Sequence, residues 1–196
     1  EAAHVVKFGN AAGSGGANPS ILIESQNPDD PGAGFAFVSG SNVRIATING
    51  ETVTTILVDL AGKRSDGGLY DIIGDTDETG GAYILELATS KCGYIYKAEM
   101  ACIETPNANK DVDLVTMPVN SWDEGEHWNT TGSIALVSGS GEWTDGMYRS
   151  SAEGTDMSKA HGNFLYLATG DNASGAAYTQ GQFIIKLYGA TREPWN

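Results

Sequence analysis

An Asn-Gly pair at residues 49 and 50 constrains the fold more than any other feature of this sequence. Two runs rich in β-branched residues flank the pair, at 43–48 and 51–60. Both central residues of a type I′ turn require a positive φ, and Asn and Gly adopt it at least cost, so the stretch predicts a two-residue β-hairpin. Short apolar runs that end in Gly, Ser, Asn or Asp recur along the chain in weaker form. The pattern favours an all-β protein.

Alternation and turn residues extend this prediction over the whole chain. Strands are expected near 4–8, 20–25, 34–38, 43–48, 51–60, 69–73, 82–88, 93–104, 112–116, 132–138, 163–169 and 178–188. Helical signals are few, and the strongest, at 151–161, is limited by Gly154 and Gly162. So many strands in 196 residues predict two packed sheets, a jelly-roll-like sandwich with little or no helix.

The domain organisation is expected to be simple. No internal repeat and no shift in composition marks a second domain, so residues 1–196 are expected to form a single β domain. The Gly/Ala/Ser tract at 10–18 is expected to be a flexible segment, and 189–196 a C-terminal tail. Residue 1 is Glu and no leader pattern follows it, which indicates a processing site or a cut boundary.

The segment 94–103 illustrates the expected alternation. Its uncharged face is expected to point into the core and consists of Tyr94, Tyr96, Ala98, Met100 and Cys102. Ile95, Lys97 and Glu99 fall on the other face, which is expected to meet water or a neighbouring molecule.

The two cysteines, Cys92 and Cys102, are too few for a disulfide scaffold. Ten residues of extended strand separate two Cα atoms by roughly 33 Å. A disulfide spans only about 6 Å between Cα atoms, so we expect two buried free thiols.

Charge and hydropathy exclude several classes of partner. The chain carries 25 acidic and 11 basic residues, for a net charge of −14. Lys63-Arg64 is the only adjacent basic pair, so nucleic acid is not an expected partner. No run of eighteen apolar residues is present, so no membrane-spanning helix is expected.

Catalytic motifs are absent from the sequence. No serine has glycine at both −2 and +2, as a hydrolase elbow requires, and no phosphate loop occurs. The three histidines are scattered, and neither HExxH nor CxxC is present, so zinc has no local support. No catalytic, cofactor-binding or metal-binding residue is assigned, and we expect a protein that is not an enzyme.

One segment has the oxygen spacing of a calcium loop. Asp75, Asp77 and Thr79 occupy positions 1, 3 and 5, Gly80 occupies position 6, and Glu86 occupies position 12. Glycines on its N-terminal side disfavour the helix that should enter such a loop. An acidic β-turn is the alternative, and the sequence leaves both open.

A second cluster is aromatic and acidic, and comprises Trp122, Asp123, Glu124, Glu126, His127, Trp128, Trp143, Asp145 and Tyr148. Exposed tryptophans beside carboxylates could stack on and hydrogen-bond sugars. Paired carboxylates could also serve a glycosidase, if Asp123, Glu126 and Asp145 surrounded one cleft. The third possibility is that Trp122, Trp128 and Trp143 belong to the core or to a subunit interface.

Three pieces resemble β-rich virion proteins of tailed phages, especially marine ones. They are Tyr70–Gly74, Gly93–Pro106 and Gly181–Gly189, which together cover about a seventh of the chain. The resemblance implies a structural protein of the virion, assembled in the host cytoplasm, such as a capsid decoration (cement) protein. None of the pieces is a catalytic motif, so the resemblance carries over no functional residue.

The leading hypothesis from the sequence is therefore a non-enzymatic capsid decoration protein. It would contact capsid or other virion proteins and form a symmetric homo-oligomer, with a trimer favoured at a local three-fold axis. The alternative is a carbohydrate-binding β module, or a tail or receptor-attachment component, that uses the Trp/acid cluster.

Overall fold

The computed structural model describes residues 22–24, 43–74, 82–122, 125–129, 131–138, 141–171 and 176–192. Its larger sheet has the strand order β1 (Leu22–Glu24), β2 (Val43–Ile48), β3 (Glu51–Asp59), β12 (Gln182–Ala190), β6 (Tyr94–Glu104) and β9 (Tyr148–Ser150). The second sheet has the order β5 (Leu85–Glu86), β10 (Phe164–Thr169), β7 (Val112–Met117) and β8 (Ile134–Val137). A two-stranded ribbon joins β4 (Arg64–Ser65) to β11 (Ala176–Ala177).

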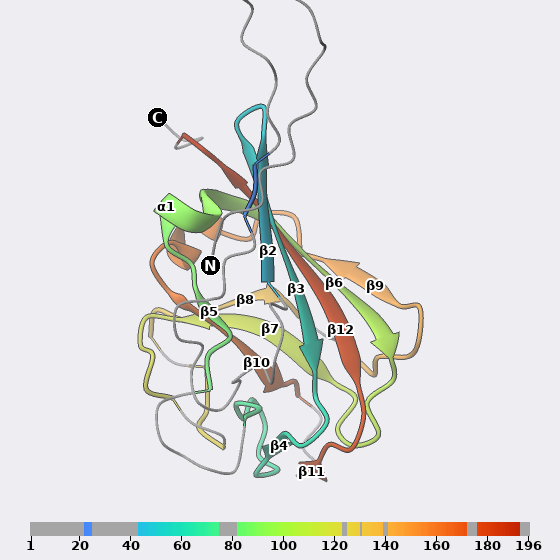
Figure 1. Ribbon diagram of the computed structural model, residues 1–196. Helices are drawn as coiled ribbons and strands as arrows, with labels where there is room; N and C mark the ends of the chain where they lie inside the picture. Colours follow the sequence, from blue (N-terminus) through green and yellow to red (C-terminus); the bar gives the residue numbers. More distant parts are fainter. Residues whose placement is uncertain are drawn as a thin grey trace, which may run out of the picture.

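Eight of these strands have the order of a jelly roll. In chain order they are β3, β5, β6, β7, β8, β9, β10 and β12. The first, eighth, third and sixth lie side by side in one sheet, and the second, seventh, fourth and fifth in the other. Two Greek keys produce this order. Figure 1 shows the smaller sheet behind the larger one, with its strands running across it. The predicted all-β, two-sheet sandwich is confirmed.

The hairpin at the Asn-Gly pair forms as predicted. Asn49 has φ 53° and Gly50 has φ 84°, the positive values that a type I′ turn requires. The register continues from this turn, with Ile48 opposite Glu51 and Val43 opposite Ile56. Along β3, buried and more exposed residues then alternate, so one side of the strand faces the core.

The prediction of which β6 side chains point into the core is correct only for the C-terminal part of the strand, where Ala98, Met100 and Cys102 are buried. The pairing with β12 shifts after Lys97, because the next β12 residue, Gly189, pairs with Ile95. The skipped residue, Tyr96, is exposed, and Ile95 is fully buried. A β-bulge of this kind reverses the faces on one side of it. The prediction that Tyr94 and Tyr96 point into the core was therefore wrong.

Several short elements were not predicted. They are β4, β9, β11 and the helix α1 (Thr89–Cys92). The predicted strand at 69–73 forms only isolated bridges, at Asp71 and Ile72. A 3₁₀ turn, Met157–Ala160, supplies the helical turn expected within 151–161. The predicted strands at 4–8 and 34–38, the segment 10–18 and tail residues 193–196 lie outside the described residues, while residues 189 and 190 belong to β12.

The core lies between the two sheets, and β7 is buried along its whole length. The largest fully buried side chains include Trp143, Tyr166, Tyr178 and Phe183. Cys92 and Cys102 are buried free thiols, as predicted. Among the described residues, no helix has the length and apolar character needed to cross a membrane.

Candidate functional site

The side of the larger sheet that faces away from the smaller sheet, called here the outer face, is the candidate site. A row of apolar side chains crosses it on four strands. Leu57 on β3 lies opposite Ile184 on β12, Ile184 lies opposite Ala101 on β6, and Ala101 lies opposite Tyr148 on β9. Figure 1 shows these four strands side by side, and cross-strand neighbours in such a sheet contact one another.

Exposed apolar side chains are concentrated on this sheet. The described residues include seven large hydrophobic side chains that are exposed, and five belong to its strands: Ile48, Leu57, Tyr96, Ile103 and Tyr148. The other two, Leu69 and Val119, lie elsewhere. Tyr148 is 56% exposed and Ile103 is 46% exposed. Single exposed hydrophobic residues are ordinary, but a cluster on one face indicates an interaction surface.

A polar network borders the apolar row and is centred on Glu99. Lys97 Nζ lies 2.5 Å from Glu99 Oε1, and the Tyr188 hydroxyl donates a 2.8 Å hydrogen bond to Oε2. Lys97 also lies over the Tyr188 ring, 5.2 Å from its centroid. Burial raises the pKa of Glu99, but hydrogen bonds from Lys97, Tyr148 and Tyr188 outweigh it and lower the pKa to about 2. The network holds Tyr188 and Tyr148 in fixed positions around one carboxylate.

The charge of the outer face differs from that of the chain. The outward positions of β2, β3, β12 and β6 hold three basic and four acidic side chains: Arg44, Lys97 and Lys186, with Glu51, Asp59, Glu99 and Glu104, the last of which pairs with the outward Gln182. Three basic and four acidic side chains give these strand positions a net charge of −1 at neutral pH, whereas the whole chain carries −14. Most of the excess negative charge therefore lies elsewhere, and another molecule can approach this face with little repulsion.

The tryptophans singled out in the sequence are mostly core residues. Trp143 is fully buried, and its Nε1 donates a 2.8 Å hydrogen bond to the Val112 carbonyl. Trp128 is 9% exposed and packs edge-on against Tyr70, with 5.9 Å between the ring centroids. Trp122 is half-buried against the core. The hypothesis that Trp128 and Trp143 stack on sugars is therefore wrong, because neither ring is accessible.

The structure describes two acidic residues of this cluster, Asp145 and Glu126, and a carboxylate outside it, Asp71, that pairs with the cluster's His127. Asp145 Oδ1 accepts 2.5 Å hydrogen bonds from both the amide and the hydroxyl of Thr105. Asp71 is buried, and its Oδ1 lies 3.4 Å from His127 Nε2. Glu126 is exposed. Asp123 and Glu124 lie outside the described residues, so a cleft formed by Asp123, Glu126 and Asp145 stays untested.

The predicted calcium loop is only partly described. Asp75 and Asp77 lie outside the described residues, and Glu86 is an exposed residue of β5. Within the described part of the chain, no three His, Cys, Asp or Glu side chains gather as a metal site would require. The calcium hypothesis for Asp75, Asp77 and Glu86 stays a prediction.

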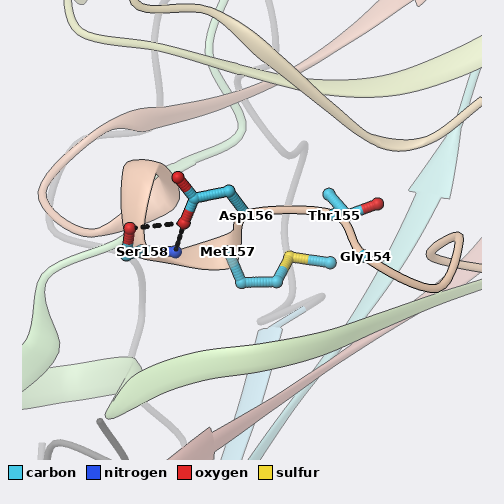
Figure 2. A pocket seen from close by; sticks show the side chains of 5 residues that line it. All are labelled: Gly154, Thr155, Asp156, Met157 and Ser158. Atoms are coloured by element: carbon cyan, nitrogen blue, oxygen red, sulfur yellow. Dashed lines mark hydrogen bonds between the residues drawn. The ribbon is translucent and has the colours of Figure 1, made fainter.

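An open cavity lies beside residues 154–158 (Figure 2). Among the described residues that line it, Asp156 is the one carboxylate, and it accepts hydrogen bonds from the amide and hydroxyl of Ser158, at 3.3 and 2.5 Å. These bonds cap the 3₁₀ turn and lower the pKa of Asp156. Met157 is buried in the core. The described wall therefore offers no free catalytic group.

Sequence reasoning did not identify the outer face. The sequence does contain a sign of this face, because the apolar residues Leu57 and Ile184 occupy strand positions where alternation predicts polar residues. Recognising it required the pairing of strands more than a hundred residues apart, which sequence periodicity does not supply. Comparison of the chain with family models, with curated proteins and with solved structures finds no match.

Proposed function

We propose that this chain is a non-enzymatic structural protein of a phage virion, and that it decorates the capsid as a cement protein. The observation that carries the proposal is the outer face: a sheet surface with clustered apolar side chains and a net charge of only −1 at its outward strand positions. Proteins that act by forming contacts need such a surface, whereas enzymes need a cleft with convergent polar groups. The phage virion part of the proposal rests on the three segments that resemble phage virion proteins, Tyr70–Gly74, Gly93–Pro106 and Gly181–Gly189.

The fold is compatible with this role. Jelly rolls form the domains of many viral capsid proteins, and also of lectins. Fold alone does not determine function, so the jelly roll supports the proposal without deciding it.

The proposed occupant of the outer face is another copy of this chain on the capsid surface. Two copies that each carry −14 repel one another in most orientations, and contact through the nearly neutral outer face minimises that repulsion. Its mixture of Tyr, Leu, Ile and paired charges also resembles the composition of protein interfaces. A trimer at each local three-fold axis is the symmetric arrangement that we favour.

Virions assembled with and without the chain test the proposal. We expect the chain in a fixed ratio to the major shell protein, and particles without it to lose their contents at lower temperature and after milder osmotic shock. Supplying the wild-type chain should restore resistance, whereas Leu57→Glu should not. Equal resistance of particles with and without the chain would refute the cement function.

The carbohydrate-binding alternative loses its main support with the burial of Trp128 and Trp143. A glycan array that compares the wild type with Tyr148→Ala tests whether the exposed Tyr148 binds sugars. Binding by the wild type and loss in the variant would favour this alternative over the cement function.

A further inference from the structure

Two basic side chains lie directly on one side of the apolar row of the outer face. Arg44 on β2 and Lys186 on β12 occupy one cross-strand row, because both lie opposite Thr55 on β3. That row is two residues away from Leu57 along β3 and from Ile184 along β12. Both basic side chains are exposed, and neither forms an ion pair with another described residue. A partner molecule can therefore contact both charges.

The acidic side chain in the same row is already compensated. Glu99 lies opposite Lys186 in the register of β6 and β12, but its carboxylate is bound by Lys97 and by the Tyr188 hydroxyl. Lys97 cancels the charge of Glu99. The charges left on this side of the apolar row are therefore those of Arg44 and Lys186.

Two acidic side chains lie on the other side of the apolar row. Asp59 on β3 and Glu104 on β6 occupy one cross-strand row, because both lie opposite Gln182 on β12. That row is two residues beyond Leu57 on β3 and Ile184 on β12. Asp59 is exposed and Glu104 is half-buried. The outer face therefore has an apolar centre, with positive charge on one side and negative charge on the other.

This charge pattern is complementary to itself in one orientation. Let two copies meet face to face, with a two-fold axis that runs along the apolar row in the plane between them. The apolar row then meets itself, and the basic row of each copy meets the acidic row of the other. Lys186 of one copy faces the position between Asp59 and Glu104 of the other. An axis parallel to the strands would instead place each charged row against its own kind, which is unfavourable.

We propose that two copies of this chain bind one another through their outer faces about the first of these axes. The inference rests on the proposed function for its setting, the capsid surface, where this contact would join copies that belong to neighbouring trimers. Adjacent strands lie about 4.8 Å apart and outward positions on one strand about 6.7 Å apart, so the four strands of the apolar row offer about 500 Å² per copy (Figure 1). A total of about 1,000 Å² is at the lower limit for a specific interface and predicts a weak dimer in solution.

Charge reversal tests the orientation by sedimentation of the isolated chain. At about 0.1 mM we expect monomers and dimers of the wild type in equilibrium. Lys186→Glu and the double variant Asp59→Lys/Glu104→Lys should each self-associate at least about tenfold more weakly, because each brings like charges together in both halves of the contact. An equimolar mixture of the two should form heterodimers about as strongly as the wild type forms dimers, because every contact again joins opposite charges.

A matched control is Lys159→Glu, the same change of charge at an exposed position in the 3₁₀ turn, which should self-associate as the wild type does. The thermal unfolding of each variant shows that it folds. If the double variant does not fold, Asp59→Lys alone replaces it, and the mixture should then recover part of the association.

Three results would overturn the inference: a wild type that stays monomeric, variants that associate as the wild type does, or a mixture that forms no heterodimers. These results are distinct from a failure of the cement function. A chain that stabilises virions but stays monomeric overturns this dimer alone. A dimer that follows the charge pattern but has no effect on virions overturns the cement function alone.

Discussion

The hydroxyl of Tyr188 on β12 donates a 2.8 Å hydrogen bond to Glu99 on β6, and Lys97 lies 2.5 Å from the same carboxylate. This bond links the two central strands of the larger sheet on its outer face. The charge on Glu99 is compensated within the chain, so a partner can cover it without leaving an unpaired carboxylate. The outer face is ordered before any partner binds, which reduces the entropic cost of binding.

The Glu99 network predicts a pH-dependent contribution to stability. The pKa of Glu99 is about 2 in the folded chain, against about 4.3 in an unfolded one. A lowered folded-state pKa stabilises the protein above the unfolded value, and this contribution disappears as the pH falls towards 2. Glu99→Gln should therefore unfold at lower temperature than the wild type at pH 7, with the difference narrowing between about pH 4 and pH 2. Thermal unfolding of both proteins between pH 2 and pH 7 measures this difference in unfolding temperature. A difference that did not change with pH would contradict the prediction.

The positive φ of Gly50 in the hairpin turn predicts that replacing this glycine lowers the stability of the protein. Gly50 has φ 84°, a conformation that costs an L-residue about 1–2 kcal/mol. Gly50→Ala should lower the free energy of unfolding by about that amount in urea titrations. Ile48→Thr, an exposed change on the same turn, is the control and should stay within about 0.5 kcal/mol of the wild type. Equal effects of the two substitutions would argue against the type I′ turn.

The burial of the tryptophans predicts that their loss affects folding. Trp143 is fully buried, and truncation of such a side chain costs about 3–5 kcal/mol. Trp143→Ala should therefore reduce stability strongly, and Trp122→Ala, at a half-buried position, should reduce it less. Urea unfolding of both variants checks that Trp143→Ala loses more stability than Trp122→Ala. If Trp143→Ala were as stable as the wild type, the ring would not be a core residue.

The thiols should be unreactive in the folded chain. Burial raises the pKa of Cys102 to about 11, with Asp145 adding to the shift, and burial also raises the pKa of Cys92. Only the thiolate reacts readily. Labelling with a disulfide reagent at pH 8 should be slow in buffer and should reach two thiols per chain in denaturant. Fast labelling of the native chain, or fewer than two thiols after unfolding, would contradict this prediction.

Much of the fold follows from local patterns. The Asn49-Gly50 hairpin and the main strands could be predicted because turn residues and alternation act over a few positions. The faces of Tyr94 and Tyr96 could not, because the bulge depends on pairing with Gly189 across the sheet. The candidate site depends still more on long-range pairing, since Leu57, Ile184 and Tyr148 come together only when β3, β12 and β9 join one sheet.

Binding to virions that lack the chain tests the central claim most directly. The wild type should bind such particles to saturation in a fixed ratio, while Leu57→Glu and Ile184→Glu should bind at least about tenfold more weakly, because each places a charge in the apolar row. Leu69→Glu and Val119→Glu change exposed hydrophobic residues outside the outer face and should bind as the wild type does. Failure of the wild type to bind, or equal binding by all four variants, would contradict the assignment of the outer face as the contact surface.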